Sequence, residues 1–529
     1  MANFAVDVVE RAPPERLAIV ALARDGTRRE WSFGQVAQAA RRLAAHLHGA
    51  HGLRRGDTVL TLIGNQPDWV AAMVACFRQG YVVLPCNEQL RPADLALRIA
   101  VCGPAAVVCD ARNEAVLRAA GWDGPTVWVP GLPDLPAAAD PPPPADLSAL
   151  DPCLITFTSG TAGEPKAALH GQRYLAGQRV QAEHWLAPQP GDLVWCTAAS
   201  GWSKSARNAF IAPWIRGAAA LLHDARFDAP QRLDLIERER VNVLCMAPTE
   251  YRVIAKRATL RPLASLRGLV AAGEALNPGV LRAWEEATGL QIRDGYGQTE
   301  TGQLTGMPPG VEVRPGSMGR ALPGIGLTID DGELVVDPAT VPTFFLRYLG
   351  DAQRRDAGGQ PWRTGDRVTR DEDGFVYFEG RTDDVIISAG YRIGPFRSSR
   401  RSSPTTRSPR PRSSPRPTTS AARLCGRSSS CATASRRPAS SPARCRTTSS
   451  SRPRPTSTPA ASTSPPSCRR PPAARSGARC CASRADRSRR QRGQLGSAMT
   501  ASISTCAPFG SATTPSATRA GGSDAKKAP

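Results

Sequence analysis

Residues 158–166 read Thr-Ser-Gly-Thr-Ala-Gly-Glu-Pro-Lys and come directly after an apolar run that ends at Phe157. Glycines let backbone N–H groups approach an anion, hydroxyls donate hydrogen bonds, and lysine supplies positive charge. The segment is not a Walker P-loop, because Lys166 follows a proline and no serine or threonine comes next. We predict a phosphate-binding loop here; the alternative is a polar strand-to-helix turn without a ligand.

Apolar runs that alternate with amphipathic segments would position this loop. The runs are near-continuous, as in parallel strands covered on both faces, and they occupy residues 58–63, 81–85, 105–109, 152–157, 192–197, 241–246 and 266–271. Ser32 and Gln35 have the spacing of a capping box and begin an amphipathic helix. This alternation predicts an α/β fold with parallel sheets, and the short strand-like segments at 323–378 predict a small β element.

Further motifs follow the loop in order. They are Gly273-Glu274 and residues 294–302, 363–366, 380–384 and 388–392. With the loop they resemble the adenylate-forming (AMP-binding) superfamily, which includes acyl-CoA synthetases, luciferases and peptide-synthetase adenylation domains. The resemblance covers essentially all of residues 1–396 and is closest to medium-chain acyl-CoA synthetases. One of these matches alone could be a turn, but five in order make chance resemblance negligible.

The resemblance implies a division of the chain into domains. Residues 1–382 would form a large AMP-binding domain of two parallel βα subdomains and a small β-barrel. Residues 383–396 would contain the hinge, with Asp383 as its aspartate, and the start of a small C-terminal α/β domain. Residues 397–529 form an Arg/Ser/Pro-rich tail in place of the rest of that domain.

The resemblance also assigns roles to individual residues. Tyr296 would stack on adenine, Asp366 would accept both ribose hydroxyls with Arg381 nearby, and Glu300 would hold Mg²⁺, a cation that prefers oxygen ligands. The implied catalytic residues are Lys166, Thr299, Glu300 and Arg392. The implied nucleotide-binding residues are Thr158, Ser159, Gly160, Thr161, Gly163, Lys166, Gly273, Glu274, Tyr296, Gly297, Gln298, Thr299, Asp366 and Arg381.

The implied reaction has two steps and uses ATP, Mg²⁺ and coenzyme A. A carboxylate attacks the α-phosphorus of ATP, which gives acyl-AMP and pyrophosphate, and the CoA thiol then attacks the acyl-adenylate. The protein would supply positioning and charge stabilisation, with Lys166 on the outgoing pyrophosphate. The small domain would rotate between the two steps at the hinge.

The nature of the acid depends on Trp202 and Gly297. In acetate-activating relatives a tryptophan stands at the position of Gly297 and closes the acyl pocket. A glycine there leaves room, so the sequence favours a medium-chain fatty acid or an aryl acid over acetate. Trp202 is a candidate for the same pocket, and core packing is its alternative role.

The tail has an unusual composition. The chain of 529 residues has a net charge of +22, yet residues 397–529 contain 25 Arg and 2 Lys against 2 Asp and no Glu. This tail contains no Val, Tyr or Trp and has only one Phe, Phe509. Such a segment cannot bury enough apolar area to offset chain entropy, so we expect it to be disordered.

A frameshift near codon 397 explains this composition. In the alternative frame, residues 397–403 permit Glu-Val-Glu-Ser-Ala-Leu-Leu, and residues 427–434 permit an apolar strand followed by a turn. Residues 468–478 permit Leu-Pro-Lys-Thr-x-Ser-Gly-Lys-Ile-Arg-Arg, the family's second lysine motif, with its catalytic lysine at the position of Arg475. Because three windows agree in one frame, we interpret the tail as a frameshift product, and we expect the chain as it stands to be impaired in adenylation.

Other function classes remain as alternatives. If the cell makes the tail as it stands, the chain would be a nucleotide-binding pseudoenzyme. The basic tail could instead bind nucleic acid, but it contains one aromatic residue, so we expect non-specific binding to polyanions and no specific nucleic-acid partner. The expected partners are the carboxylic acid and CoA. The sequence has no apolar run of membrane-spanning length and no secretory signal, which predicts a cytoplasmic protein. Its 14 cysteines form no C-x-x-C pair, and we expect them to be reduced.

Overall fold

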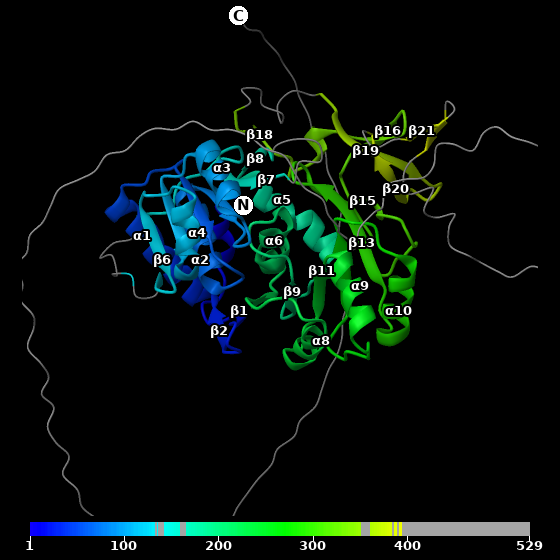
Figure 1. The fold of residues 1–529 in the computed structure, drawn as a ribbon, viewed down its shortest axis with the longest axis horizontal. Helices are drawn as coiled ribbons and strands as arrows, with labels where there is room; N and C mark the ends of the chain where they lie inside the picture. Colours follow the sequence, from blue (N-terminus) through cyan, green and yellow to red (C-terminus); the bar gives the residue numbers. More distant parts are fainter. Residues whose placement is uncertain are drawn as a thin grey trace, which may run out of the picture. The chain divides into compact units, whose positions relative to one another are not determined.

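The computed structural model describes residues 1–132, 135, 142–158, 165–350 and 360–382, together with the backbone of Ile386–Ser388 and Tyr391–Ile393 (Figure 1). Several predictions therefore lie outside the described residues. They concern the centre of the phosphate loop with Ser159, Gly160, Thr161 and Gly163, the hinge residue Asp383, and the whole tail with Arg475.

The first sheet has the strand order β18-β8-β7-β4-β3-β5-β6. Its strands are β3 (Thr58–Leu62), β4 (Val82–Cys86), β5 (Ala106–Asp110), β6 (Thr126–Val129), β7 (Pro152–Phe157), β8 (Ala167–Gly171) and β18 (Arg347–Tyr348). The strands from β7 to β6 pair in parallel, as predicted, while β8 pairs antiparallel with both β7 and β18.

The second sheet has the order β15-β14-β13-β12-β11-β9-β10-β1-β2. Its strands are β1 (Leu17–Leu22), β2 (Arg28–Ser32), β9 (Leu193–Cys196), β10 (Ala219–His223), β11 (Val243–Met246), β12 (Gly268–Ala272), β13 (Ile292–Gln298), β14 (Gly302–Gly306) and β15 (Arg320–Ala321). The centre of the sheet, from β13 to β1, is parallel, and hairpins add antiparallel strands at both edges. The prediction of parallel sheets is confirmed for the buried centres.

Helices cover both faces of each sheet. The α-helices are α1 (Phe33–His51), α2 (Pro67–Gln79), α3 (Pro92–Cys102), α4 (Glu114–Ala119), α5 (Arg173–Gln181), α6 (Ser203–Ala206), α7 (Ala212–Ile215), α8 (Ala229–Arg238), α9 (Pro248–Arg257) and α10 (Pro278–Thr288). Shorter π- and 3₁₀-helical turns are η1 (Ala5–Glu10), η2 (Ala111–Asn113), η4 (Ala182–Leu186), η5 (Arg207–Ile211) and η6 (Pro338–Thr340). Ser32 caps α1 as predicted, because its hydroxyl accepts from the Gln35 amide and the Gln35 side chain accepts from the Ser32 amide.

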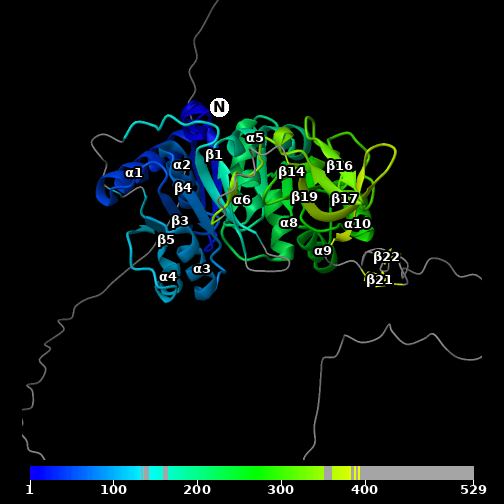
Figure 2. The same ribbon diagram turned by 90° about the horizontal axis from the view of Figure 1, so that it is seen from above.

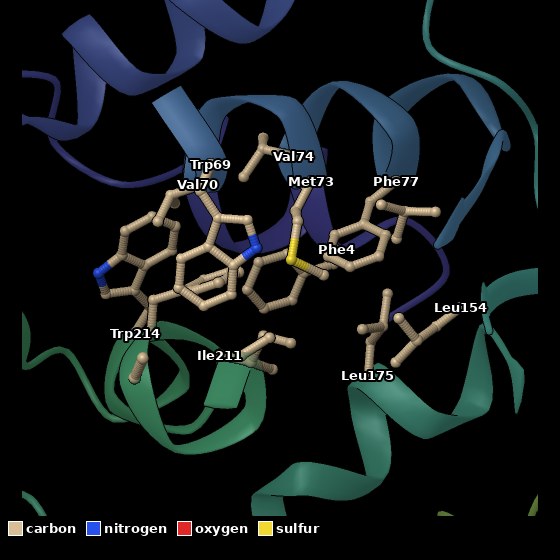
Figure 3. Close-up of a cluster of buried hydrophobic side chains, with 14 of the residues drawn as sticks. Phe4, Trp69, Val70, Met73, Val74, Phe77, Leu154, Leu175, Ile211 and Trp214 are labelled. Atoms are coloured by element: carbon tan, nitrogen blue, oxygen red, sulfur yellow. The ribbon is translucent and has the colours of Figure 1, made fainter. Parts of the chain in front are cut away.

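The main core lies between the two sheets. Figure 3 shows α2 with Trp69, Met73 and Phe77 turned towards Phe4 and towards Trp214 of α7. Inward residues of both sheets join this cluster, while separate clusters form on the outer faces, under α3 and α4 for the first sheet and under α8–α10 for the second. In Figure 2, β3–β5 accordingly lie between α2 on one side and α3 and α4 on the other. This layering holds the parallel strands in place. The predicted site residues come at or just after the carboxyl ends of three of them, β7, β12 and β13.

A small antiparallel sheet with the order β16-β17-β19-β20 confirms the predicted β element. Its strands are β16 (Leu327–Asp330), β17 (Glu333–Val336), β19 (Trp362–Arg370) and β20 (Val376–Arg381), and the hairpin of β21 (Ile386–Ser388) and β22 (Tyr391–Ile393) follows. The register of β19 and β20 places Asp366 directly opposite Arg381. Among the helices that the structure describes, none has the length and apolarity needed to cross a bilayer.

Candidate active site

The predicted ribose residues meet around Asp366, where the end of β13 reaches the small sheet. Tyr296 Oη donates to Asp366 Oδ2, and Gln298 Nε2 donates to the same oxygen at 2.9 Å. Arg381 Nη1 donates to Asp366 Oδ1 at 3.0 Å and to the Thr364 carbonyl at 3.1 Å. The Gln298 side chain is fixed from the other side by Trp362, whose indole N–H donates to Gln298 Oε1 at 3.0 Å. Strands β13 and β20 therefore converge on one carboxylate of β19.

This cluster is buried and holds an ion pair. Asp366 is 5% exposed and forms an ion pair with Arg381. Burial, followed by the negative charge of Asp366, raises the pKa of Tyr296 well above its ordinary value. The Tyr296 phenol therefore remains a hydrogen-bond donor at neutral pH, and Asp366, to which it donates, is the group that would accept from a ribose diol.

The residues predicted to bind phosphate and metal meet around Tyr348. The Lys166 ammonium lies over the Tyr348 ring at 5.2 Å from its centroid, and the Tyr348 hydroxyl donates to Glu300 Oε1 at 2.6 Å. The pairing of β18 with β8 produces this arrangement, because Tyr348 lies opposite Ala168, close to Lys166 in the chain. Thr158 closes the start of the loop, since its hydroxyl accepts from the Lys166 amide at 3.2 Å. Tyr348 was not predicted from the sequence.

Glu300 supplies a donor set that suits Mg²⁺. The described residues contain no group of three or more His, Cys, Asp or Glu side chains that could hold a metal ion by themselves. Mg²⁺ is commonly bound by one or two carboxylates together with substrate phosphates, so a single buried glutamate beside a phosphate loop fits this mode. Within the structure the carboxylate is held by Tyr348, and the Glu300 carbonyl accepts from the Phe345 amide at 2.8 Å.

Gly273 and Glu274 follow β12, as predicted, and Lys204 of α6 lies against them. Lys204 Nζ donates to the Ala272 carbonyl at 2.8 Å. A Cβ atom on Gly273, which has φ of +106°, would lie 2.8 Å from the same ammonium. Glu274 is exposed and accepts from Thr249 Oγ1 at 2.7 Å. The glycine is therefore favoured by its backbone conformation.

Two buried titratable side chains, Asp294 and His170, lie in or near the motif at 294–302. Burial raises the pKa of the Asp294 carboxyl well above its ordinary value. Burial also lowers the pKa of His170 to about 3, with the nearby Arg207 as a further cause. The backbones of Thr299 and Thr343 approach the His170 ring and act in the opposite direction. His170, on β8, is therefore a neutral ring that lies close to the backbone of Thr299.

The predicted acid-pocket residues have different surroundings. The Trp202 side chain is 54% exposed at the start of α6, so its alternative role as a core residue is wrong. A Cβ on Gly297 would lie 1.8 Å from the Gly302 carbonyl oxygen, at the register shift between β13 and β14. The close approach of β14 by itself accounts for the glycine, and room for a long acid at this position stays a prediction.

A cavity of about 730 Å³ lies at the carboxyl ends of β9 and β10. Open α/β sheets bind ligands at this edge. Arg112 on its wall bridges Glu88 at 2.7 Å and Asp224 at 2.6 Å, so residues from both sheets close around it. A Cβ on Gly64 would lie 2.1 Å from Asp224 Oδ1, so a larger residue at this position would displace side chains of the ion cluster.

A model of the AMP-binding enzyme family matches residues 6–342. This chain belongs to the AMP-binding enzyme family. It is 33% identical over 416 residues to "Uncharacterized acyl--CoA ligase YtcI" of Bacillus subtilis, over 73% of this chain and 77% of that protein. It is 32% identical to the human acyl-coenzyme A synthetase ACSM4, mitochondrial, over 74% of this chain and 75% of that protein. The crystal structure of Brucella canis acyl-CoA synthetase superposes with a TM-score of 0.66 at 30% identity, covering 74% of this chain and 78% of that one.

Membership establishes the reaction class as AMP-forming acid–thiol ligation, in a family that depends on ATP and uses CoA. It also confirms the predicted adenylate-forming α/β fold. The two clusters around Asp366 and Tyr348 contain several of the residues that the sequence motifs predicted.

Not every predicted residue can be placed in these clusters. Arg392 lies in β22, whose backbone pairs with β21, and its side chain is outside the described residues.

All seven cysteines of the described part are free, and six are buried, in line with the expected reduced thiols. The sequence motifs contained Gln298, Thr364 and Asp366 but not Trp362, which holds the Gln298 side chain. Trp362 directly precedes the motif at 363–366, and that adjacency is the signal that could have indicated it.

Proposed function

We propose that this chain derives from an ATP-dependent acyl-CoA ligase that activates a medium-chain fatty acid or an aryl acid through acyl-AMP. The observation that carries the proposal is the convergence of Tyr296, Gln298 and Arg381 on Asp366, next to the group of Lys166, Tyr348 and Glu300. Asp366 would bind the ribose diol, Lys166 the outgoing pyrophosphate, and Thr299 the α-phosphate. Glu300 would hold Mg²⁺, which would offset phosphate charge.

The preference for a longer or aromatic acid rests on the resemblance to medium-chain enzymes and on Gly297 in place of a tryptophan. The proposal includes the prediction that the chain as it stands is impaired. Its residues 397–529 lack the family's second lysine motif, which the alternative reading frame would place at 468–478. That lysine would contact the reacting carboxylate and phosphate, so its loss should remove a preorganised charge from the transition state.

The test compares two proteins in ATP–pyrophosphate exchange: the chain as it stands and a version whose tail is translated in the alternative frame from codon 397. We expect the second protein to exchange with octanoate or benzoate in preference to acetate. We expect the first to be slower by about a hundredfold or more, the usual consequence of losing one preorganised charge.

A matched control is Arg475→Lys in the chain as it stands. It supplies the missing ammonium without the surrounding domain, so it should not restore exchange. Comparable rates for the first two proteins would contradict the predicted impairment, and inactivity of both with every acid would contradict the ligase assignment.

The pseudoenzyme is the second candidate, because the site on residues 1–382 is assembled without the tail. Calorimetric titration with ATP separates it from the others. Binding without exchange, by a chain whose tail peptides are found in the native protein, would favour it. Salt-sensitive RNA binding with no affinity for ATP would favour the basic tail as the functional part.

A further inference from the structure

Three buried glutamines line one small cavity behind β13 and β14. They are Gln178 and Gln181 of α5 and Gln303 of β14, which are 0%, 2% and 4% exposed. The cavity they share with Thr343 has a volume of about 10 Å³. A cavity of this volume is about large enough to hold one water molecule.

The amide nitrogens of these glutamines are already used. Gln178 Nε2 donates to the Tyr174 carbonyl at 3.0 Å, and Gln303 Nε2 donates to the Thr305 carbonyl at 2.9 Å. Because a carbonyl can only accept, these two bonds fix which end of each amide is the oxygen. Gln181 Nε2 donates to Asn208 Oδ1 at 3.1 Å.

The amide oxygens, in contrast, have no hydrogen-bond partner among the described residues. A buried oxygen without a donor carries an uncompensated desolvation cost. Three such oxygens around one cavity therefore indicate an occupant that donates hydrogen bonds, and an apolar group would leave all three unpaired.

Gln303 connects the cavity to β13, the strand that carries Tyr296. Gln303 Nε2 lies 2.3 Å from where a Cβ of Gly295 would be, whereas the next residue, Tyr296, reaches Asp366. Successive residues of a strand face opposite sides, so Gln303 lies on the face of β13 opposite the ribose cluster, and Gln178 and Gln181 share its cavity. Thr343 on the cavity wall donates to the Thr301 carbonyl at 2.5 Å, within the turn that carries Thr299 and Glu300.

We propose that this glutamine pocket (Gln178, Gln181 and Gln303) selects an acid that carries a hydroxyl or amino group at the end remote from its carboxylate. The inference rests on the proposed function and deepens it, because it divides medium-chain and aryl acids by their far substituent. One hydroxyl or amino group matches the volume of the cavity and supplies the donor that the amide oxygens lack. A methyl group of the same size supplies none.

The test uses the full chain and 5′-O-(N-acylsulfamoyl)adenosines, stable analogues of acyl-AMP that bind without turnover. Calorimetry compares matched pairs: 4-hydroxybenzoyl or 4-aminobenzoyl with 4-methylbenzoyl, and 8-hydroxyoctanoyl with nonanoyl. We expect at least one donor-bearing analogue to bind about tenfold more tightly than its methyl partner.

Gln303→Met should reduce that preference to about twofold or less, because methionine keeps the length and removes the amide. Gln172→Met is the matched control: Gln172 is equally buried and also has unpartnered amide atoms, but it does not line the cavity. It should leave the preference unchanged. If Gln303→Met does not fold, as judged by thermal melting, Gln178→Met replaces it.

Equal or tighter binding of the methyl analogue in every pair would overturn the inference while leaving the ligase assignment intact. So would a preference that survives both Gln303→Met and Gln178→Met. If no acyl analogue bound more tightly than 5′-O-sulfamoyladenosine, the proposed function would fail and the inference with it.

Discussion

The two sides of β13 differ in how completely their polar groups are paired. On the side of Tyr296, the Asp366 carboxylate accepts from three side chains, and Gln298 is held at both ends. On the opposite side, the oxygens of Gln178, Gln181 and Gln303 have no donor among the described residues. The ribose side is therefore organised before any ligand binds, whereas the other side is left for an occupant to complete.

This difference follows from what each side has to recognise. A nucleotide is the same for every member of the family, so a fixed network can be complementary to it. The acid varies, and unpaired groups at a cavity wall discriminate strongly, since the wrong substituent leaves buried polar atoms unsatisfied. Substitutions on the ribose side should thus alter the affinity for all acyl-AMP analogues alike. Substitutions on the glutamine side should alter the ranking of the analogues by affinity.

The largest effect is expected from Asp366→Asn. The amide keeps the shape but loses the charge that pairs with Arg381 and that would accept from the ribose diol, so affinity for AMP and for all acyl analogues should fall about a hundredfold. Calorimetry measures this, with Asp371→Asn as the control, because Asp371 pairs with Arg314 just beyond β19. A loss confined to some acyl analogues would contradict the separation of the two sides.

A smaller effect is expected from Tyr296→Phe. The ring that would stack on adenine remains and one hydrogen bond to Asp366 is lost, so AMP affinity should fall about three- to tenfold. Tyr377→Phe removes a phenol that donates to Asp371 at 3.0 Å in the same sheet and should have no effect. A loss as large as that of Asp366→Asn would mean that the phenol, rather than the carboxylate, organises the ribose side.

The sequence predicted one side of β13 better than the other. The seven predicted runs match observed strands within one or two residues, because apolar runs mark parallel strands directly; β7 coincides with residues 152–157, whereas the equally buried β8 and β10 were not predicted. The ribose residues lie in short contiguous motifs, so they too could be read. The glutamines come from α5 and β14, more than a hundred residues apart, and only the tertiary structure brings their amides together. Tyr348 was missed for the same reason.

Tyr348→Phe tests the phosphate cluster that completes the ribose side. The phenyl ring still lies beneath Lys166, but Glu300 loses the donor at 2.6 Å. The free carboxylate would move more, so the apparent Mg²⁺ affinity in the presence of ATP should fall about threefold, while the affinity for AMP should be unchanged. Titration of ATP binding with Mg²⁺ measures the effect. An equal loss of affinity for AMP and for Mg²⁺·ATP would show that Tyr348 acts on the whole site rather than on Glu300 alone.

Asp68→Asn should change neither side of β13 and should change the stability of the scaffold. Burial raises the pKa of Asp68 in the first turn of α2 from 3.8 to about 6, with Asp110 as a further cause. Its carboxyl stabilises the fold fully below pH 3.8, and this contribution is lost as the pH rises through about 6, since the folded state resists ionisation.

The neutral amide does not ionise, so Asp68→Asn should be about 1–3 kcal/mol more stable than the parent at pH 8 and similar to it at pH 4. Thermal melting across this range measures the difference. Asp94→Asn is the matched control, because Asp94 lies in the first turn of α3, is exposed, and has its pKa lowered by Arg91. Its small effect should therefore have the opposite sign at neutral pH. If Asp68→Asn altered the order of the acyl analogues, the preference at the glutamine pocket would depend on scaffold stability, and the contrast between the two sides of β13 would not hold.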